Sequence, residues 1–174
     1  MRRLWPWLVT IAVISSSGCT TENSSGSMKF GQMNTIGSDI GEEGVTVLRI
    51  DRGSPTDFDQ LPDPGKFTDR KSYYLRYRLT KTSSHGFSFT PFVLSNGSTV
   101  FSELSELAGG PRTPLTGLHG SDGCTAVNDE QLDFLPDGKS VDGCLIFVAP
   151  VGGNSAPTQV EWRLDNFPPR GIWR

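Results

Sequence analysis

Metal-binding and nucleophilic side chains are scarce in this sequence, which has three cysteines and two histidines among 174 residues. No C-x-x-C pair occurs, so a zinc site or a nucleophilic cysteine lacks the partners that it needs. A positive net charge is also missing, since 16 Lys and Arg stand against 19 Asp and Glu, for a formal charge of −3. This balance argues against a nucleic-acid partner, because phosphate binding requires clustered Lys and Arg.

Apart from one short N-terminal stretch, the sequence has no long apolar run. Met1-Arg2-Arg3 is a positive n-region, and the run from Leu4 to Ile14 has about half the length of a membrane span. We therefore predict that residues 1–18 are an export signal, removed from the mature chain. Removal takes away the charges of Arg2 and Arg3, so the formal net charge falls from −3 to −5.

Ser16-Ser17-Gly18-Cys19 ends this segment and resembles the lipobox of bacterial lipoproteins. Gly18 and Ser17 match the pattern, whereas Ser16 stands where an aliphatic residue is usual. The resemblance implies that Cys19 carries diacylglycerol and a further acyl chain such as palmitate. Two or three chains, at about 0.8 kcal/mol per buried methylene, would anchor the protein stably to the outer face of the cell membrane. An ordinary secreted protein, cut nearby, is the alternative.

One folded domain is expected after the signal, because single cores usually organise about 100 to 200 residues. We assign residues 19–43 to the acylated cysteine and a flexible tether, and residues 44–174 to the domain. Export places Cys124 and Cys144 in an oxidising compartment, so we predict that they form a disulfide. The closed loop of about 20 residues would stabilise the fold by roughly 3 kcal/mol.

The domain also lacks an amphipathic helical pattern of ten residues, and its apolar residues alternate instead. In VTVLRID (45–51), alternation places Val45, Val47 and Arg49 on one face of a strand. YYLRYRLTK (73–81) is a stronger half-buried strand, with these residues inward: Tyr73, Leu75, Tyr77 and Leu79.

Shorter strands and turns follow these two. Asn96-Gly97 predicts a tight hairpin, because both residues tolerate positive φ. FSELSEL (101–107) predicts at most a turn or two of helix. Further strands are expected in 87–95, 98–101, 141–150 and 158–164. The pattern predicts an all-β, antiparallel sandwich of about seven strands.

The order of four segments resembles a known family. These segments are YYLRYRLTKTSS, PFVLSNGSTVF, LPDGKSVDGCLIFVAP and VEWRL. Together they are similar to the telokin-like, immunoglobulin-type domain of unknown function in Gram-positive and actinobacterial lipoproteins, over Val45 to Leu164. The resemblance implies an immunoglobulin-like sandwich in a cell-envelope lipoprotein, and its motifs are structural rather than catalytic. The stretch from Gly109 to Cys124 departs from the pattern as a long insert.

The histidines are the usual candidates for a general base. His85 and His119 both lie between turn residues, which favours exposed loop positions. A hydrolase would join His119 to Ser121 and Asp122, but neighbours in one loop rarely satisfy triad geometry. We therefore predict no catalytic residues.

Two acidic stretches could be considered for calcium: Asp57, Asp59 and Asp63, and then Asp129, Glu130, Asp133 and Asp137. Neither has the D-x-[DN]-x-[DN]-G loop followed by a distant glutamate. We therefore expect these carboxylates to lie in solvated loops, and we predict no metal and no cofactor.

The C-terminal aromatics could form an exposed platform for a sugar or a protein. Trp162, Phe167 and Trp173 cluster there with Pro168 and Pro169. Alternation favours a different reading, in which Trp162 faces the core and Trp173 closes the end of the sandwich.

The sequence thus predicts a lipid-anchored, extracytoplasmic lipoprotein that acts as a non-catalytic binding or surface-presenting module. Its partner besides the membrane would be a protein or a carbohydrate, with specificity carried by loops such as 109–124. Two alternatives stay open: an envelope hydrolase using a loop histidine, and a structural or immunogenic envelope component.

Overall fold

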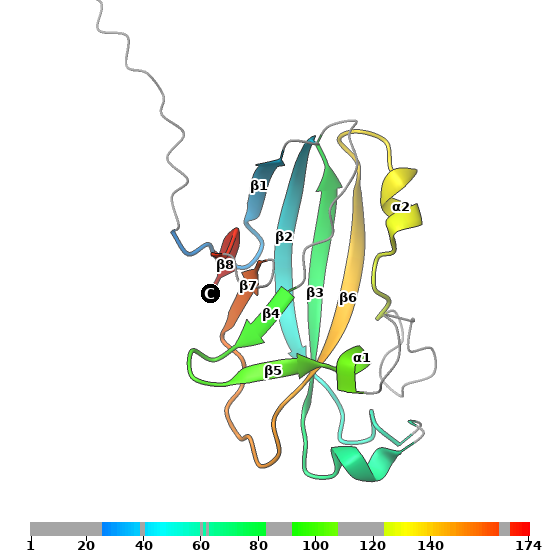
Figure 1. Cartoon of the computed structure of the whole chain (residues 1–174), viewed down its shortest axis with the longest axis vertical. Coiled ribbons are helices and arrows are strands. Elements are labelled where there is room, and N and C mark those ends of the chain that lie inside the picture. The colour runs from blue at the N-terminus through cyan, green and yellow to red at the C-terminus, as the bar shows by residue number, and fades with distance from the viewer. Residues whose placement is uncertain are drawn as a thin grey trace, which may run out of the picture.

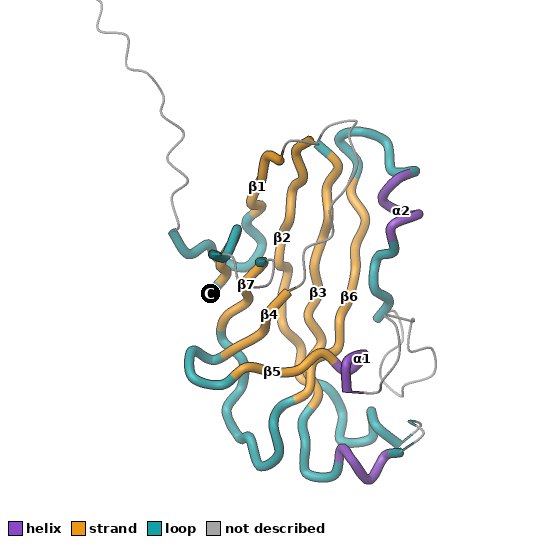
Figure 2. Tube along the Cα trace, in the orientation of Figure 1, coloured by secondary structure: helices purple, strands orange, loops and turns teal. Residues whose placement is uncertain are grey.

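The computed structural model describes residues 26–38, 41–59, 61, 63–82, 92–107, 124–163 and 168–174. Within these ranges the chain forms eight β-strands, paired antiparallel, and three short helical segments (Figures 1 and 2). The strands are β1 Met33–Ser38, β2 Gly41–Arg52, β3 Ser72–Lys81, β4 Phe92–Ser95, β5 Val100–Glu103, β6 Ser140–Val148, β7 Gln159–Trp162 and β8 Gly171–Trp173. The helical segments are η1 Pro64–Phe67, α1 Leu104–Leu107 and α2 Asp129–Asp133. The predicted all-β antiparallel class is confirmed, with eight strands rather than about seven.

One strand links the two layers of the sandwich. The order is β1-β2-β3-β6-β5-β4-β7-β8, in which β2, β3 and β6 are the long strands of Figure 1 and the shorter β1 lies at their edge. β5 pairs with β6 through Ser102 and Glu103, and with β4 through Val100 and Phe101. The sheet therefore turns at β5, so that β4, β7 and β8 pack against the inner face of the long strands.

Large aromatic residues fill the core between the layers. The inward residues of β3 are buried as alternation predicts, and the Tyr77 ring lies 5.0 Å from the Phe92 ring. Trp162 and Trp173 are also fully buried, which confirms the core-facing reading and excludes them from an exposed platform. Phe167 lies outside the described residues. Aromatic side chains each bury a large area, which explains how a sequence with 35% hydrophobic residues can close a core.

A β-bulge in β2 makes the predicted faces of this strand wrong after Val47. Val45 and Val47 lie in the core, but the pairing with β3 shifts between Val47 and Arg49. Because one extra residue moves every later side chain to the other face, Ile50 packs toward the core. Arg49, which alternation placed beside the valines, is exposed and its guanidinium donates to Asp51 at 2.9 Å.

The folded domain extends into the range that the sequence analysis assigned to the tether. Its described N-terminal segment pairs first with β8, where the Met28 amide donates to the Ile172 carbonyl at 2.8 Å. It then continues as β1, which pairs with β2 from Met33 onward. The indole of Trp173 donates to the Gln32 carbonyl at 2.9 Å. One chain segment thus joins both layers along this side. In the described part of the chain, β pairing is already present at Met28, whereas the domain was predicted to begin at residue 44.

Candidate functional site

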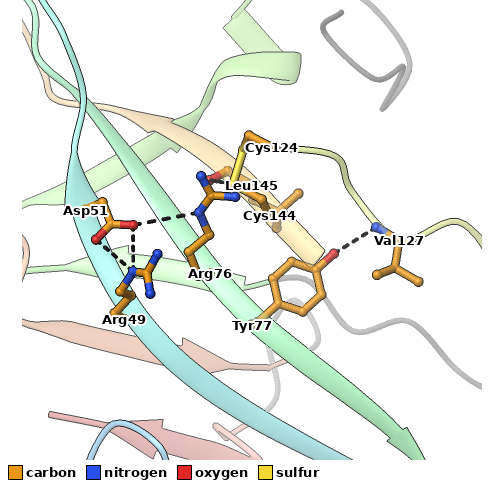
Figure 3. Close-up of a disulfide and its surroundings, with 8 residues drawn as sticks. All are labelled: Arg49, Asp51, Arg76, Tyr77, Cys124, Val127, Cys144 and Leu145. Atoms are coloured by element: carbon orange, nitrogen blue, oxygen red, sulfur yellow. Dashed lines mark hydrogen bonds and ion pairs between the residues drawn. A yellow bond between two sulfur atoms is a disulfide. The ribbon is translucent and has the colours of Figure 1, made fainter. Parts of the chain in front are cut away.

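A disulfide fixes the chain beside β6, as the sequence predicted. Cys124 and Cys144 are bonded, with their Cα atoms 4.7 Å apart (Figure 3). The Cys144 amide also donates to the Thr125 carbonyl at 2.9 Å. The segment that follows the predicted insert is therefore attached to β6 by both a covalent and a backbone contact.

The residues that follow Thr125 cover this side of the core. The Val127 amide donates to the Tyr77 hydroxyl at 3.1 Å, and both Val127 and Leu132 are buried (Figure 3). α2 begins with a capping box, in which Asn128 Oδ1 accepts from the Gln131 amide and Gln131 Oε1 accepts from the Asn128 amide. These contacts hold residues 124–135 as a fixed cover, which we call the α2 segment.

One aromatic side chain projects from this cover into solvent. Phe134 follows α2 and is 81% exposed, the largest value among the exposed large apolar residues that the structure describes. Glu130, Asp133 and Asp137 are exposed close to it in sequence. Single exposed apolar residues are common on protein surfaces, so Phe134 by itself only marks a position. Its rigid support and acidic surroundings make it a candidate contact for a basic or aromatic partner.

The outer face of the long strands is a weaker candidate for a ligand site than the α2 segment, because its charged side chains pair with one another. The Arg78 guanidinium contacts the Asp142 carboxylate through two nitrogens, at 2.6 and 3.0 Å. This pairing lowers the pKa of Asp142 below its ordinary value. Thr80 and Ser140, two residue pairs further along the same two strands, share a hydrogen bond of 2.8 Å.

A buried carboxylate lies under the loop between β2 and β3. Asp57 is fully buried, and its Oδ2 accepts from the Ser54 amide at 3.0 Å and from the Ser72 hydroxyl at 2.5 Å. Burial and the neighbouring Asp57 carboxylate raise the pKa of the Tyr74 hydroxyl. Gly53 completes the cluster, since a Cβ there would lie 2.1 Å from Asp57 Oδ2. Asp57 Oδ2 is satisfied within the cluster, whereas Asp57 Oδ1 and the Tyr74 hydroxyl are buried without a hydrogen-bond partner. The contacts of Oδ2 tie the loop to β3, which indicates a structural role.

Replacing Asp57 by alanine is expected to lower the free energy of unfolding by about 2 kcal/mol, because the Ser54 amide and the buried Ser72 hydroxyl lose their acceptor. Urea unfolding of both proteins measures the difference. Asp59→Ala is the matched control: it removes an exposed carboxylate two residues away and should change stability little. Equal effects of the two variants would show that the Asp57 contacts contribute nothing specific.

The two acidic stretches considered for calcium do not assemble into a metal site in the described part of the chain. Asp57 is used internally, and Asp63 forms an ion pair with Lys66 at 3.2 Å. Over the described ranges, no group of three or more His, Cys, Asp or Glu side chains could hold a metal ion. Among the same residues, the helices are all too short to cross a membrane.

The predicted lipidation site and the candidates weighed for a hydrolase lie outside the described residues, as does most of the insert. They are Cys19, His85, His119, Ser121 and Asp122, together with the insert from Gly109 up to residue 123. The α2 segment, in contrast, is described by the structure but was not predicted from the sequence, because its acidic residues suggest a solvated loop. The available signal was the Asn128-x-x-Gln131 spacing of a capping box.

Comparisons with known proteins assign no activity to this chain. No family model matches the sequence, and no curated protein matches it. The resemblance to the telokin-like lipoprotein domain therefore stays a prediction. Among solved structures, the chain is similar to MPT63, a secreted protein from Mycobacterium tuberculosis, with a TM-score of 0.49 and 14% sequence identity. The match covers 84% of this chain and 95% of that chain.

Proposed function

We propose that this chain is a lipid-anchored, extracytoplasmic β-sandwich lipoprotein that binds a partner or presents a surface without catalysing a reaction. The observation that carries the proposal is the bond between Cys124 and Cys144. Such bonds persist in oxidising compartments, which supports export. Of the three cysteines this leaves Cys19, placed directly after an apolar run and small residues, for acylation.

The first backbone pairing among the described residues lies close to Cys19 in the sequence, which supports a short connection to the anchor. Among the described residues, backbone pairing begins at Met28, nine residues after Cys19. Even when fully extended, nine residues span only about 30 Å. An acylated Cys19 would hold the sandwich next to the membrane.

The binding half of the proposal rests on the α2 segment. Phe134 is exposed on a cover that the disulfide and the Tyr77 hydroxyl hold in place. Residues presented on a rigid scaffold are typical of recognition surfaces. The exposed carboxylates near Phe134 favour a partner that carries basic groups, either on a protein or on an envelope polymer.

Cys19→Ala should release the processed protein from the membrane into the aqueous fraction, because the acyl chains are lost. Fractionation of cells, followed by intact-mass measurement of the recovered chain, checks the result. Ser17→Ala is the matched control, since it keeps a small residue before the cleavage site and leaves Cys19 in place. Recovery of a processed Cys19→Ala chain with the membranes would contradict lipid anchoring.

A further inference from the structure

The two ends of the described domain meet at one edge of the sandwich. The Arg174 amide donates to the Met28 carbonyl at 2.9 Å, beside the Met28 to Ile172 bond. Figure 1 shows this edge, formed by β1 and β8, on the side of the molecule opposite α2. The chain that leads back to Cys19 therefore leaves from the β1–β8 edge.

A fixed turn presents apolar side chains at this edge. The Gln32 amide donates to the Lys29 carbonyl at 3.1 Å, and Gly31 between them has a φ of 86°, which favours glycine. The Gly31 amide donates to the Val47 carbonyl at 2.7 Å, which fixes the turn to β2. Phe30 at its tip is 37% exposed, and Met33 just after it is 51% exposed.

Three cationic residues lie near these two side chains. Lys29 precedes Phe30 in the sequence, the backbone of Arg174 bonds to Met28, and the guanidinium of Arg174 donates to the neutral Gln159 side chain at 2.7 Å. Lys29 and Arg174 are exposed, and Arg170 is partly exposed. Among the described residues, no carboxylate side chain forms an ion pair with any of the three. The mature chain as a whole is acidic, at −5 after loss of Arg2 and Arg3, so this edge differs in sign from the average surface.

We propose that the β1–β8 edge, defined by Lys29, Phe30, Met33, Arg170 and Arg174, rests on the surface of an anionic bilayer. This inference builds on the proposed lipid anchor. Exposed aromatic and thioether side chains beside cations suit the headgroup region of acidic lipids. The segment from Cys19 to Met28 would join the same bilayer to the domain at this edge. This short connection raises the effective concentration of the edge at the lipid surface.

The orientation has a consequence for recognition. With the β1–β8 edge on the lipid, α2 lies on the opposite side of the molecule (Figure 1). Phe134 directly follows α2, so it would lie on the side away from the membrane. The candidate contact surface would then be open to partners in the envelope.

Fluorescence quenching by lipid can test the orientation. The mature chain has two tryptophans, Trp162 and Trp173, and both are fully buried. Phe30→Trp therefore introduces one exposed indole at the proposed contact, and Phe134→Trp introduces one on the opposite side as the matched control. Each mature chain is coupled through the Cys19 thiol to a maleimide lipid in vesicles. This coupling makes the test independent of natural acylation, so failure of the anchor is seen separately in the Cys19→Ala experiment.

Vesicles of brominated phosphatidylglycerol should quench the new fluorescence of Phe30→Trp about threefold more strongly than that of Phe134→Trp. The reason is that the bromine atoms, which are on the lipid, quench only an indole that contacts them. Adding Lys29→Ser to Phe30→Trp, or raising the salt concentration, should reduce the quenching. Equal quenching of the two variants, or stronger quenching of Phe134→Trp, would overturn the proposed orientation. Stronger quenching of Phe134→Trp would place the α2 segment on the membrane instead.

Discussion

Replacing both Cys124 and Cys144 by alanine is expected to lower the free energy of unfolding by about 3 kcal/mol. The bond closes a sequence separation of 20 residues, and a loop of that length restricts the unfolded chain by roughly this amount. It also holds the α2 segment against β6, so we expect amides 125–135 to exchange hydrogen faster in the variant. Urea unfolding and hydrogen exchange measure the two effects.

A Cys19→Ala background isolates the effect of this disulfide, because no other cysteine is then present. In that background, a reducing agent should destabilise the protein with both Cys124 and Cys144 about as much as the double substitution does. The double variant itself should not respond to the reducing agent. Equal stability of the oxidised, reduced and doubly substituted proteins would contradict a stabilising disulfide.

Gly143→Ala is expected to cost about 3 kcal/mol, because the core has no space for the added methyl group. Gly143 pairs with Tyr77 across β6 and β3, and a Cβ there would lie 2.3 Å from Tyr77 Cζ. The ring cannot move aside freely, since it packs on Phe92 and its hydroxyl accepts from the Val127 amide. Thermal or urea unfolding of the variant gives the loss.

Gly65→Ala is the matched control for this prediction. Its added Cβ would lie no closer than 3.6 Å to a neighbour, which is an ordinary contact. Adding Tyr77→Leu to Gly143→Ala should cost less than the sum of the single changes, because the clash disappears with the ring. If Gly143→Ala were as stable as Gly65→Ala, the close packing of Tyr77 over β6 would be refuted.

The strands with regular alternation were predictable from the sequence. β3 carries its four inward residues as expected, and the Asn96-Gly97 turn joins β4 to β5, with Gly97 at a φ of 89°. β7 falls within its predicted range, and β6 begins one residue before the range 141–150. In each case side-chain periodicity or turn chemistry is local, so it can be read without knowing the rest of the fold.

The remaining features depend on contacts between distant segments. β1 and β8 are short edge strands without an apolar alternation, and their pairing is set by neighbours already in the sheet. The bulge before Arg49 leaves no sequence signal, so the alternation predicted the wrong face for that residue. The exposure of Phe134 follows from how α2 packs through Leu132, which alternation of polar and apolar residues did not show.

The central claim is that an exported chain loses its signal, is acylated at Cys19 and folds outside the cell around the Cys124–Cys144 bond. Intact-mass measurement of the protein extracted from membranes tests this claim most directly. The account predicts a chain that begins at Cys19, carries the mass of its acyl groups and gains the mass of two hydrogen atoms on reduction. A chain that still begins at Met1, an unmodified Cys19, or no change on reduction would contradict it.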